Sequence, residues 1–399
     1  MSAATHERPK LTLTPGGAKR LRQGSPWVFS NEIAMDTAAK ALEPGALVEL
    51  QAAGGAALGT AFFNRHALIA ARLLDDQPGR AVDADFFAAR LRRARDLREL
   101  VIPGPFYRLI HAEADGLPGL VVDRFDEAFV VQANTAGMER LTPLLLEALE
   151  AVFSPQVIVL RNDSAARELE GLDSEVRLAK GTLDGPVRLI ENGATFLADL
   201  RAGQKTGWFY DQRDNRAWTA GLAAGRRVLD CFSYSGGFAL QAALAGAAKV
   251  TLLDRSEQAL ELARQAAEAN GVAERCRFNR ADGFNRLEQL GGREERFDLV
   301  ICDPPAFVKS RKDLQRGARA YRKLARLAAN TLAPGGILVI CSCSHHVDAA
   351  HFLQQVARGL TDAGRPGRVI HQGGAGPDHP LHPALPESGY LKALFILLD

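Results

Sequence analysis

The pattern of apolar and polar positions divides the chain into three parts. From Leu11 to Leu74, short alternating apolar segments such as "GALVELQ" and "AALGTAFF" are broken by glycine. Alternation with a period of two is typical of half-buried strands, and the glycines between them indicate turns. We therefore expect a small β-barrel or sheet module over residues 1–76.

The second part mixes the helical and the strand periods. "ADFFAARLRRARDLREL" predicts a helix whose apolar positions alternate with basic ones, and the amphipathic "MERLTPLLLEALEAVF" predicts another. The runs "LPGLVVDRF" and "AFVVQAN" predict strands. Residues 77–190 therefore indicate an α+β domain.

In the third part, after about Leu200, continuous apolar runs alternate with alanine-rich helical patterns. One helix is expected to be capped by Ser256 and to stop at Gly271. The runs are "RRVLDCF", "KVTLLD", "CRFNRAD", "FDLVICD", "GGILVICS" and "YLKALFILL". Apolar strands separated by helices indicate a parallel sheet that is covered on both faces. Residues 191–399 therefore predict a doubly wound, Rossmann-like α/β domain.

Composition narrows the class of protein. The 399 residues suit two or three domains, and the formal net charge of +2 does not by itself indicate nucleic-acid binding. No apolar run approaches the roughly 20 residues that span a bilayer, and "MSAATHERPK" lacks the apolar core of a secretory signal. The five cysteines have no paired spacing, which favours a reducing, cytoplasmic setting over a disulfide framework.

Polar residues follow the strands of the third part where a doubly wound sheet binds ligands, beyond the carboxyl ends. Gly236 allows a close backbone approach after the first strand, Asp254 could bind the hydroxyls of a ribose, and Asp282 could bind an adenine amine beside Phe284. The third glycine of a dinucleotide fingerprint is missing, which weakens a nicotinamide or flavin interpretation. Although a single Asp in such a place is often only a cap or turn former, the succession favours S-adenosylmethionine.

The fourth strand ends in "CDPPAF". Two prolines cannot donate to a sheet, so the chain must leave it there and present Asp303 at the rim. The fifth strand ends in "CSCSHH", which could suggest zinc, but structural zinc sites use Cys-x-x-Cys pairs and no second pair is present. We expect no metal.

Cys341 and Cys343 are two residues apart and are expected to face the same side of a strand, with Cys343 nearer the ligand edge. A pyrimidine C5 becomes nucleophilic only after a group has added to C6, so methylation of that atom requires a nearby thiolate. Buried, inert thiols are the alternative, and this is the expected state of Cys231, Cys276 and Cys302.

These motifs resemble those of the bacterial methyltransferase I family, S-adenosylmethionine-dependent enzymes that modify cytosine C5 in large-subunit (23S) ribosomal RNA. The resemblance covers almost the whole chain. It rests on "GQKTGWFYDQRDNR", "VLDCFSYSGGF", "VTLLDRS", "ADGF", "FDLVICDPPAFVKS", "GGILVICSCSHH" and "DHPLHPALPESGYLK". It implies an N-terminal PUA-type RNA-binding domain in "LTPGGAKRLRQGSPWVFSNEI" and an α+β linking domain around "HAEADGLPGLVVDRF".

The resemblance also implies roles for single residues. Cys343 would be the nucleophile and Asp303 would hold the cytosine at the edge of the cofactor pocket. The remaining residues of that pocket would be Gln204, Lys205, Phe209, Asp211, Arg213, Ser233, Gly236, Asp254 and Asp282. Cys341 is an extra thiol beside the motif, which leaves open which sulfur acts.

Basic residues cluster in two places where an RNA backbone could pass, although a solvated helix face is the alternative. They are Lys19, Arg20 and Arg22 near the N-terminus, and Lys309, Arg311 and Lys312 after the Asp-Pro-Pro turn. We expect large-subunit ribosomal RNA as the partner, and a homodimer is left open.

Two other functions compete with this hypothesis. Methylation of an exocyclic base nitrogen typically needs an aromatic residue directly after Asp-Pro-Pro, where this chain has Ala306 and places Phe307 one position later. A non-catalytic RNA-binding or assembly protein would not need S-adenosylmethionine at all.

Overall fold

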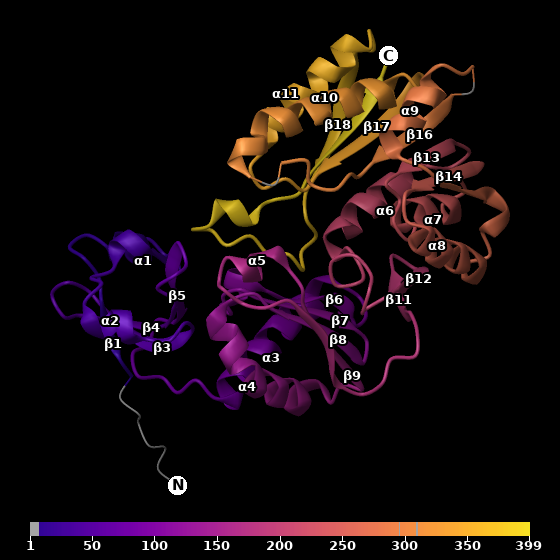
Figure 1. Ribbon diagram of the computed structural model, residues 1–399. Coiled ribbons are helices and arrows are strands. Elements are labelled where there is room, and N and C mark those ends of the chain that lie inside the picture. Colours follow the sequence, from indigo (N-terminus) through magenta and orange to yellow (C-terminus); the bar gives the residue numbers. More distant parts are fainter. Residues whose placement is uncertain (1–7, 295, 309) are drawn as a thin grey trace. The chain divides into compact units, whose positions relative to one another are not determined.

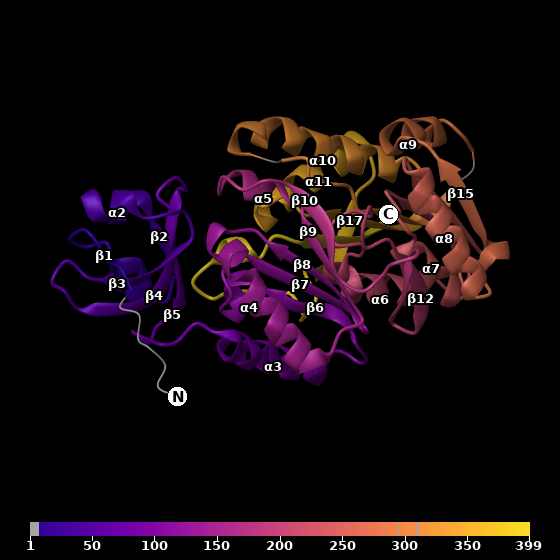
Figure 2. The same ribbon diagram turned by 60° about the horizontal axis from the view of Figure 1, so that its bottom comes forward.

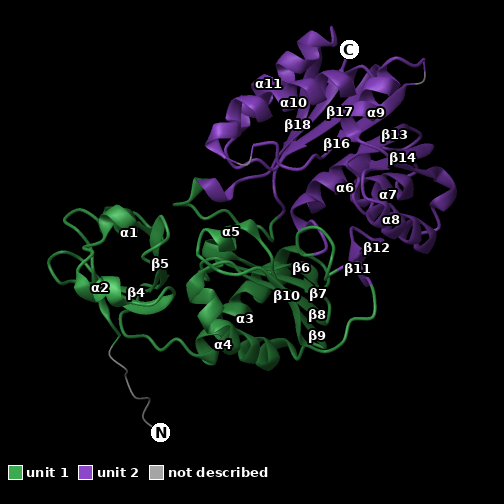
Figure 3. Ribbon diagram, viewed as in Figure 1, with its two compact units in different colours: residues 1–185, 200–206, 377–386 green, residues 186–199, 207–376, 387–399 purple. Residues whose placement is uncertain are grey.

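The computed structural model describes residues 8–294, 296–308 and 310–399. The chain forms two compact units, shown in green and purple in Figure 3. Unit 1 comprises residues 1–185, 200–206 and 377–386, and unit 2 comprises residues 186–199, 207–376 and 387–399. Two short segments that are remote in sequence therefore complete unit 1.

The N-terminal part of unit 1 is a five-stranded sheet in the order β1-β3-β4-β5-β2. Strands β1 and β3 are parallel, and the other pairs are antiparallel. Val48, Leu50 and Phe63 belong to its buried core, as the alternating pattern predicts. The elements are β1 (Lys10–Thr12), α1 (Lys19–Arg22), β2 (Trp27–Phe29), η1 (Ser30–Glu32), α2 (Thr37–Ala41), β3 (Ala46–Gln51), β4 (Ala57–Phe63) and β5 (Ile69–Asp75).

The rest of unit 1 is a second five-stranded sheet, β10-β9-β8-β7-β6, with two long helices packed against it (Figure 2). The side chains of Asp83 and Thr135 cap the N-termini of these helices, α3 and α4. The expected α+β arrangement is confirmed. The elements are α3 (Ala84–Val101), β6 (Phe106–His111), η2 (Ala112–Asp115), β7 (Leu120–Phe125), β8 (Ala128–Ala133), α4 (Ala136–Phe153), β9 (Val157–Asn162), α5 (Ala165–Glu168) and β10 (Glu175–Lys180).

Unit 2 is built on a seven-stranded sheet in the order β15-β14-β13-β16-β17-β19-β18 (Figure 1). The expected doubly wound fold is confirmed. Its elements are β11 (Val187–Glu191), β12 (Ala194–Ala198), η3 (Tyr210–Gln212), α6 (Arg213–Gly221), β13 (Arg227–Cys231), α7 (Gly237–Leu244), β14 (Lys249–Asp254), α8 (Glu257–Ala269), η4 (Ala273–Arg275), β15 (Cys276–Arg280), α9 (Gly283–Gly291), β16 (Phe297–Cys302), η5 (Arg311–Asp313), α10 (Leu314–Ala329), β17 (Leu332–Ser342), α11 (Ala349–Asp362), β18 (Gly367–Gly373), η6 (Pro386–Ser388, which begins on the last residue of unit 1) and β19 (Lys392–Leu398).

The last apolar run departs from the expected parallel sheet. It forms β19, which lies between β17 and β18 and is antiparallel to both. β18 was not expected as a strand, because it is largely exposed and its "GRVIHQG" carries few apolar residues.

The two faces of the large sheet are covered by different helices. Buried residues of α9, α10 and α11 pack with Leu229, Val300 and Leu338 on one face. On the other face, α7 contacts β13 and β14, and α8 contacts β14 and β15. Strand order reverses between β13 and β16, so their carboxyl ends, Cys231 and Cys302, flank the switch point where such sheets bind ligands. No helix in the described part of the chain is long and apolar enough to cross a membrane.

Candidate active site

The loop after β13 has a strained backbone. Phe232 and Tyr234 have φ values of 65° and 49°, and Gly236, which precedes α7, has a φ of 85°. Only glycine adopts this left-handed region at low cost, and strained non-glycine residues cluster at ligand sites. The Asp254 carboxylate fixes the loop by accepting a hydrogen bond of 2.8 Å from the Tyr234 N–H.

Three buried polar atoms around this loop have no hydrogen-bond partner in the part of the chain that the structure describes: Ser233 Oγ, Ser235 Oγ and Asp230 Oδ1. Leaving such an atom unpaired costs about 1–3 kcal/mol, so the loop is better suited to hold a polar ligand than to be empty. The Ala239 N–H donates to the other oxygen of Asp230 at 3.0 Å. Burial and then the nearby Asp303 raise the pKa of Asp230 well above its usual range.

Asp254 and Asp282 both make local contacts of the kind that the sequence offered as the alternative to cofactor binding, in a turn and at a helix cap. The second oxygen of Asp254 accepts a hydrogen bond of 2.9 Å from the Ser256 N–H. Asp282 caps the N-terminus of α9 and lies 3.8 Å from the Arg255 guanidinium. Because each carboxylate oxygen has two lone pairs, these bonds leave capacity for a ribose or a base.

The expected nucleophile lies beside the expected base-holding turn. Cys343 is half-buried, and its Sγ is 4.0 Å from the carbonyl oxygen of Pro304, the residue after Asp303. The neighbouring strands β16 and β17 run parallel, which brings their carboxyl ends together. The exposure of Cys343 and this contact fit a thiol that can reach a ligand at the rim of the sheet.

The two cysteines of "CSCS" have different surroundings, although both were expected to face the same side of a strand. Strand β17 ends at Ser342, so Cys343 lies in the turn beyond it. Cys341 is fully buried, and burial raises the pKa of its thiol well above the ordinary value. Among the other thiols, Cys231 and Cys302 are buried as expected, whereas Cys276 is only half-buried, with a pKa raised by burial to about 11.

A buried tyrosine that sequence reasoning missed holds both serines that flank Cys343. The Tyr321 hydroxyl, on α10, lies 2.8 Å from Ser342 Oγ and 2.8 Å from Ser344 Oγ. Ser344 Oγ also accepts a hydrogen bond of 3.1 Å from the Val308 N–H. We call Tyr321, Ser342 and Ser344 the serine clamp.

Lys392 is a second residue that the motifs did not single out. It begins β19 opposite Ser342, and its Nζ donates hydrogen bonds of 2.8 Å to the Ser344 carbonyl and 2.7 Å to the Tyr390 carbonyl. Burial lowers the pKa of Lys392 to about 8, while the negative charges of Cys343 and Asp348 act in the opposite direction. The ammonium is therefore electrostatically coupled to the thiol.

The residues of "GQKTGWFYDQR" divide between the units. Phe209 contacts the loop after β13, with its ring 5.4 Å from that of Tyr234 in a T-shaped arrangement. Asp211 and Arg213 are buried, and the Tyr390 hydroxyl donates to the Asp211 carboxylate. The motif residues that belong to unit 1 are 203–206, which include Gln204 and Lys205.

The residues expected to bind RNA are mostly exposed. Arg20 is partly engaged, because its guanidinium is 3.3 Å from the Glu32 carboxylate and 4.9 Å from the centre of the Phe29 ring. Lys309 lies outside the described residues. The other four are exposed: Lys19, Arg22, Arg311 and Lys312.

Sequence comparison decides which class of enzyme this site belongs to. The profile of the S-adenosylmethionine-dependent methyltransferases matches residues 160–380, and that of a PUA-like domain matches residues 11–76. The chain belongs to the S-adenosylmethionine-dependent methyltransferase family. Its cofactor is therefore S-adenosylmethionine, and the unpaired hydroxyls of Ser233 and Ser235 and the strained loop fit a polar ligand of this kind.

Full-length relatives of this methyltransferase carry a more specific name. The protein named "Ribosomal RNA large subunit methyltransferase I" in Aeromonas salmonicida is 37% identical over 391 residues, which cover 97% of this chain and 98% of that protein. Its namesake in Erwinia tasmaniensis is 38% identical over 388 residues, which cover 96% and 98%.

Solved structures share the whole fold. A methyltransferase-like protein crystallised with SAH superposes with a TM-score of 0.83 at 20% identity, covering 98% of this chain and 100% of that chain. A SAM-dependent methyltransferase-like protein from Streptococcus mutans gives a TM-score of 0.81 at 21% identity, with the same coverage. In the residues that the structure describes, no group of three His, Cys, Asp or Glu side chains could hold a metal ion.

Proposed function

We propose that this methyltransferase modifies C5 of a cytosine in large-subunit ribosomal RNA through a covalent adduct with Cys343. The observation that carries the proposal is the half-buried thiol of Cys343, 4.0 Å from the carbonyl of Pro304 beside Asp303. The relatives named ribosomal RNA large subunit methyltransferase I support the substrate. A ribosomal RNA substrate and free cysteines support a cytoplasmic location.

The thiolate of Cys343 would add to C6 of the cytosine, and the electron pair of the C5–C6 double bond would make C5 nucleophilic. S-adenosylmethionine supplies an electrophilic methyl group to that carbon. Loss of the C5 proton would then restore the double bond and expel the thiolate. Asp303, at the rim beside Pro304, would hold the base by hydrogen bonds while the S–C6 bond forms and breaks.

Lys392 would favour the reactive form of the nucleophile. A cation close to a thiol stabilises the thiolate and lowers the pKa of the thiol. The Nζ of Lys392 is fixed by the carbonyls of Ser344 and Tyr390, so its charge has a defined place next to Cys343. The serine clamp would hold the residues on both sides of Cys343, and so would fix the direction in which the chain that carries Cys343 leaves β17.

Because Cys343 is only partly accessible, a cytosine stacked in folded RNA would have to turn out of its stack or be unpaired to reach it. The PUA-like domain, with exposed Lys19 and Arg22, would add affinity for RNA without taking part in the chemistry.

The proposal is tested by incubating the protein with unmodified ribosomal RNA and S-adenosylmethionine and mapping the methylated nucleotide by mass spectrometry. We expect 5-methylcytosine at one position. Cys343→Ala should reduce the rate at least about a thousandfold, since a covalent nucleophile is lost. Cys341→Ala is the matched control and should keep most of the activity, because that thiol is buried.

Two results would overturn the proposal. Full activity in Cys343→Ala with the methyl group on an exocyclic nitrogen would assign the enzyme to amine methylation. Absence of S-adenosylmethionine binding in calorimetry would leave a non-catalytic RNA-binding protein.

A further inference from the structure

One edge of the large sheet in unit 2 is not covered as a doubly wound sheet normally is. In β14, Val250 and Leu252 are buried on the side of α7 and α8, whereas Lys249 and Thr251 alternate with them and point to the other face. In β15, Arg277 continues the polar row. Strands that are covered on both faces are apolar on both, so this alternation marks an open face beside α9.

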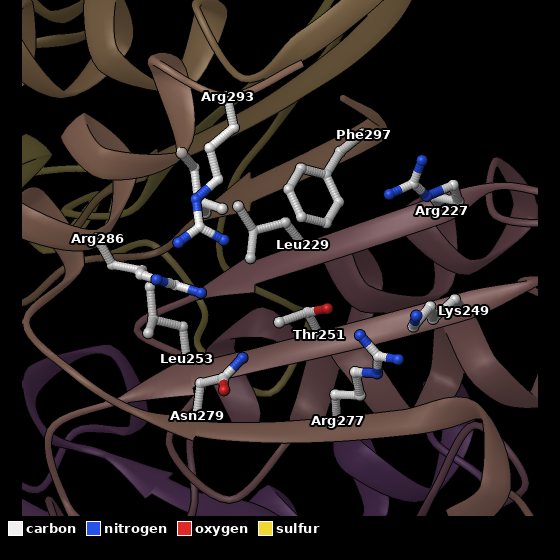
Figure 4. Close-up of a pocket in the computed structure, with 11 residues that line it drawn as sticks. Arg227, Leu229, Lys249, Thr251, Leu253, Arg277, Asn279, Arg286, Arg293 and Phe297 are labelled. Atoms are coloured by element: carbon white, nitrogen blue, oxygen red, sulfur yellow. The ribbon is translucent and has the colours of Figure 1, made fainter. Parts of the chain in front are cut away.

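The open face forms a groove with a volume of about 150 Å3 (Figure 4). Its apolar lining includes Leu229, Leu253 and Phe297. The cationic side chains lie around this apolar part, and those from α9 and the loop after it face those from the strands. They are Arg227, Lys249, Arg277, Arg286 and Arg293. None of the described residues that line the groove is acidic.

In the described part of the chain, no carboxylate pairs with four of the five cationic side chains, whereas Arg227 lies beside Asp298, whose carboxylate accepts a hydrogen bond of 2.8 Å from the Arg227 backbone N–H. Within the described residues, Lys249, Arg277, Arg286 and Arg293 form no ion pair with an Asp or Glu side chain. Arg286 donates to the neutral Gln289 amide oxygen at 3.2 Å. Like charges that converge on one groove repel each other, and a bound anion removes that repulsion.

We propose that this groove, which we call the basic groove, binds the phosphate backbone of the RNA substrate. The proposal rests on the proposed function, since it names a second contact of the same enzyme with its RNA. The charge of the lining selects a polyanion, and the volume suits a phosphate with its ribose. Guanidinium groups are well matched to phosphate oxygens, and Thr251 and Asn279 add neutral hydrogen-bonding groups.

The cationic end of the basic groove is separate from the candidate active site. Arg227 and Lys249 are the first residues of their strands, whereas the site lies beyond the last residues, Cys231 and Asp254. The apolar lining runs along β14 as far as Leu253. At about 3.3 Å per residue, the two ends of β14 are roughly 16 Å apart. The basic groove would therefore hold RNA away from the target cytosine, raising affinity without touching the reaction.

The test compares two pairs of substitutions that each remove two positive charges. Arg277→Gln/Arg293→Gln alters the exposed rim of the basic groove. Arg358→Gln/Arg368→Gln is the control, because both side chains are exposed and neither lines the groove. Binding to an unmodified large-subunit ribosomal RNA transcript is measured by fluorescence anisotropy over a series of salt concentrations.

We expect the basic-groove pair to bind about tenfold more weakly at low salt, with the slope of log K against log salt smaller by about one to two. The control pair should stay within about twofold of the wild type. In methyl transfer, the basic-groove pair should raise KM for RNA and leave kcat unchanged. Arg277→Glu/Arg293→Glu, which reverses the charge, should weaken binding further than the glutamine pair.

Equal losses in both pairs, or no loss in the basic-groove pair, would refute the proposal. So would unchanged RNA affinity together with lost binding to polyglutamate, because that result would assign the groove to an acidic protein surface. Failure of the proposed function is recognised separately. If the wild type binds RNA through the basic groove and transfers no methyl group, the groove stands and the proposed chemistry fails.

Discussion

The serine clamp gives a quantitative prediction for Tyr321→Phe. The substitution removes one hydroxyl that lies 2.8 Å from each of two buried serine oxygens, Ser342 Oγ and Ser344 Oγ. The ring itself stays, so packing against Phe307 and Phe352 is preserved. Each serine keeps a weaker backbone partner, so we expect the free energy of unfolding of unit 2 to fall by about 1–3 kcal/mol.

The kcat of Tyr321→Phe should fall by more than the loss of folded protein would explain. A displacement of about 1 Å at a reacting atom can cost up to about a hundredfold in rate, and the clamp fixes the turn that carries Cys343. We expect kcat to decrease at least about tenfold while the affinity for S-adenosylmethionine is unchanged.

Urea unfolding followed by tryptophan fluorescence measures the stability of unit 2 in a Trp27→Phe background, because Trp208 and Trp218 then report on that unit alone. Tyr107→Phe is the matched control for activity. It removes another buried phenol hydroxyl, bonded to Arg124 in unit 1, and should leave kcat unchanged. A destabilised Tyr321→Phe enzyme with the kcat of the wild type would refute the positioning role of the clamp.

Two further substitutions test the electrostatics of the site. Lys392→Met should move the acidic limb of the pH–rate profile to higher pH by about one unit, because the thiol loses its cation; an unchanged profile would exclude this role. Burial lowers the pKa of Lys392 from its ordinary value of 10.5 to about 8 in the folded chain, so the unfolded chain binds more protons between these two pH values. The free energy of unfolding of the wild type should therefore rise with pH across that window. This rise should vanish in Lys392→Met. Asp230 has a raised pKa in the folded chain, so the wild type should lose stability as pH rises above the usual carboxyl range. Urea unfolding of Asp230→Asn over a series of pH values above that range should show a smaller loss, and an equal loss would contradict the assigned pKa direction.

Much of the fold could be predicted because the pattern of side chains and the final burial agree. The runs ending in Cys231 and Cys302 are apolar and lie at the centre of the sheet, where both faces are covered. The direction of β19 could not be predicted, since an apolar run is equally compatible with parallel and antiparallel neighbours. β18 could not be predicted as a strand, because this edge strand has few apolar residues.

The position of Cys343 beside the turn that follows Asp303 could be predicted, because both segments follow the ends of neighbouring strands. The parts of the site that depend on contacts between segments far apart in the sequence could not be predicted. Tyr321 looked like one more core residue of an amphipathic helix, and Lys392 like the start of an apolar strand. Only the folded chain shows that both reach the residues around Cys343.

A trapped adduct tests the central claim most directly. Ribosomal RNA transcribed with 5-fluorocytidine cannot lose a C5 proton after methyl transfer, so the S–C6 bond should persist and give a complex that resists denaturation. Peptide mass mapping should place the cross-linked nucleotide on Cys343, and Cys343→Ala should give no such complex while Cys341→Ala still does. A nucleotide attached at Cys341, or turnover of the RNA without any cross-link to the wild type, would contradict the account.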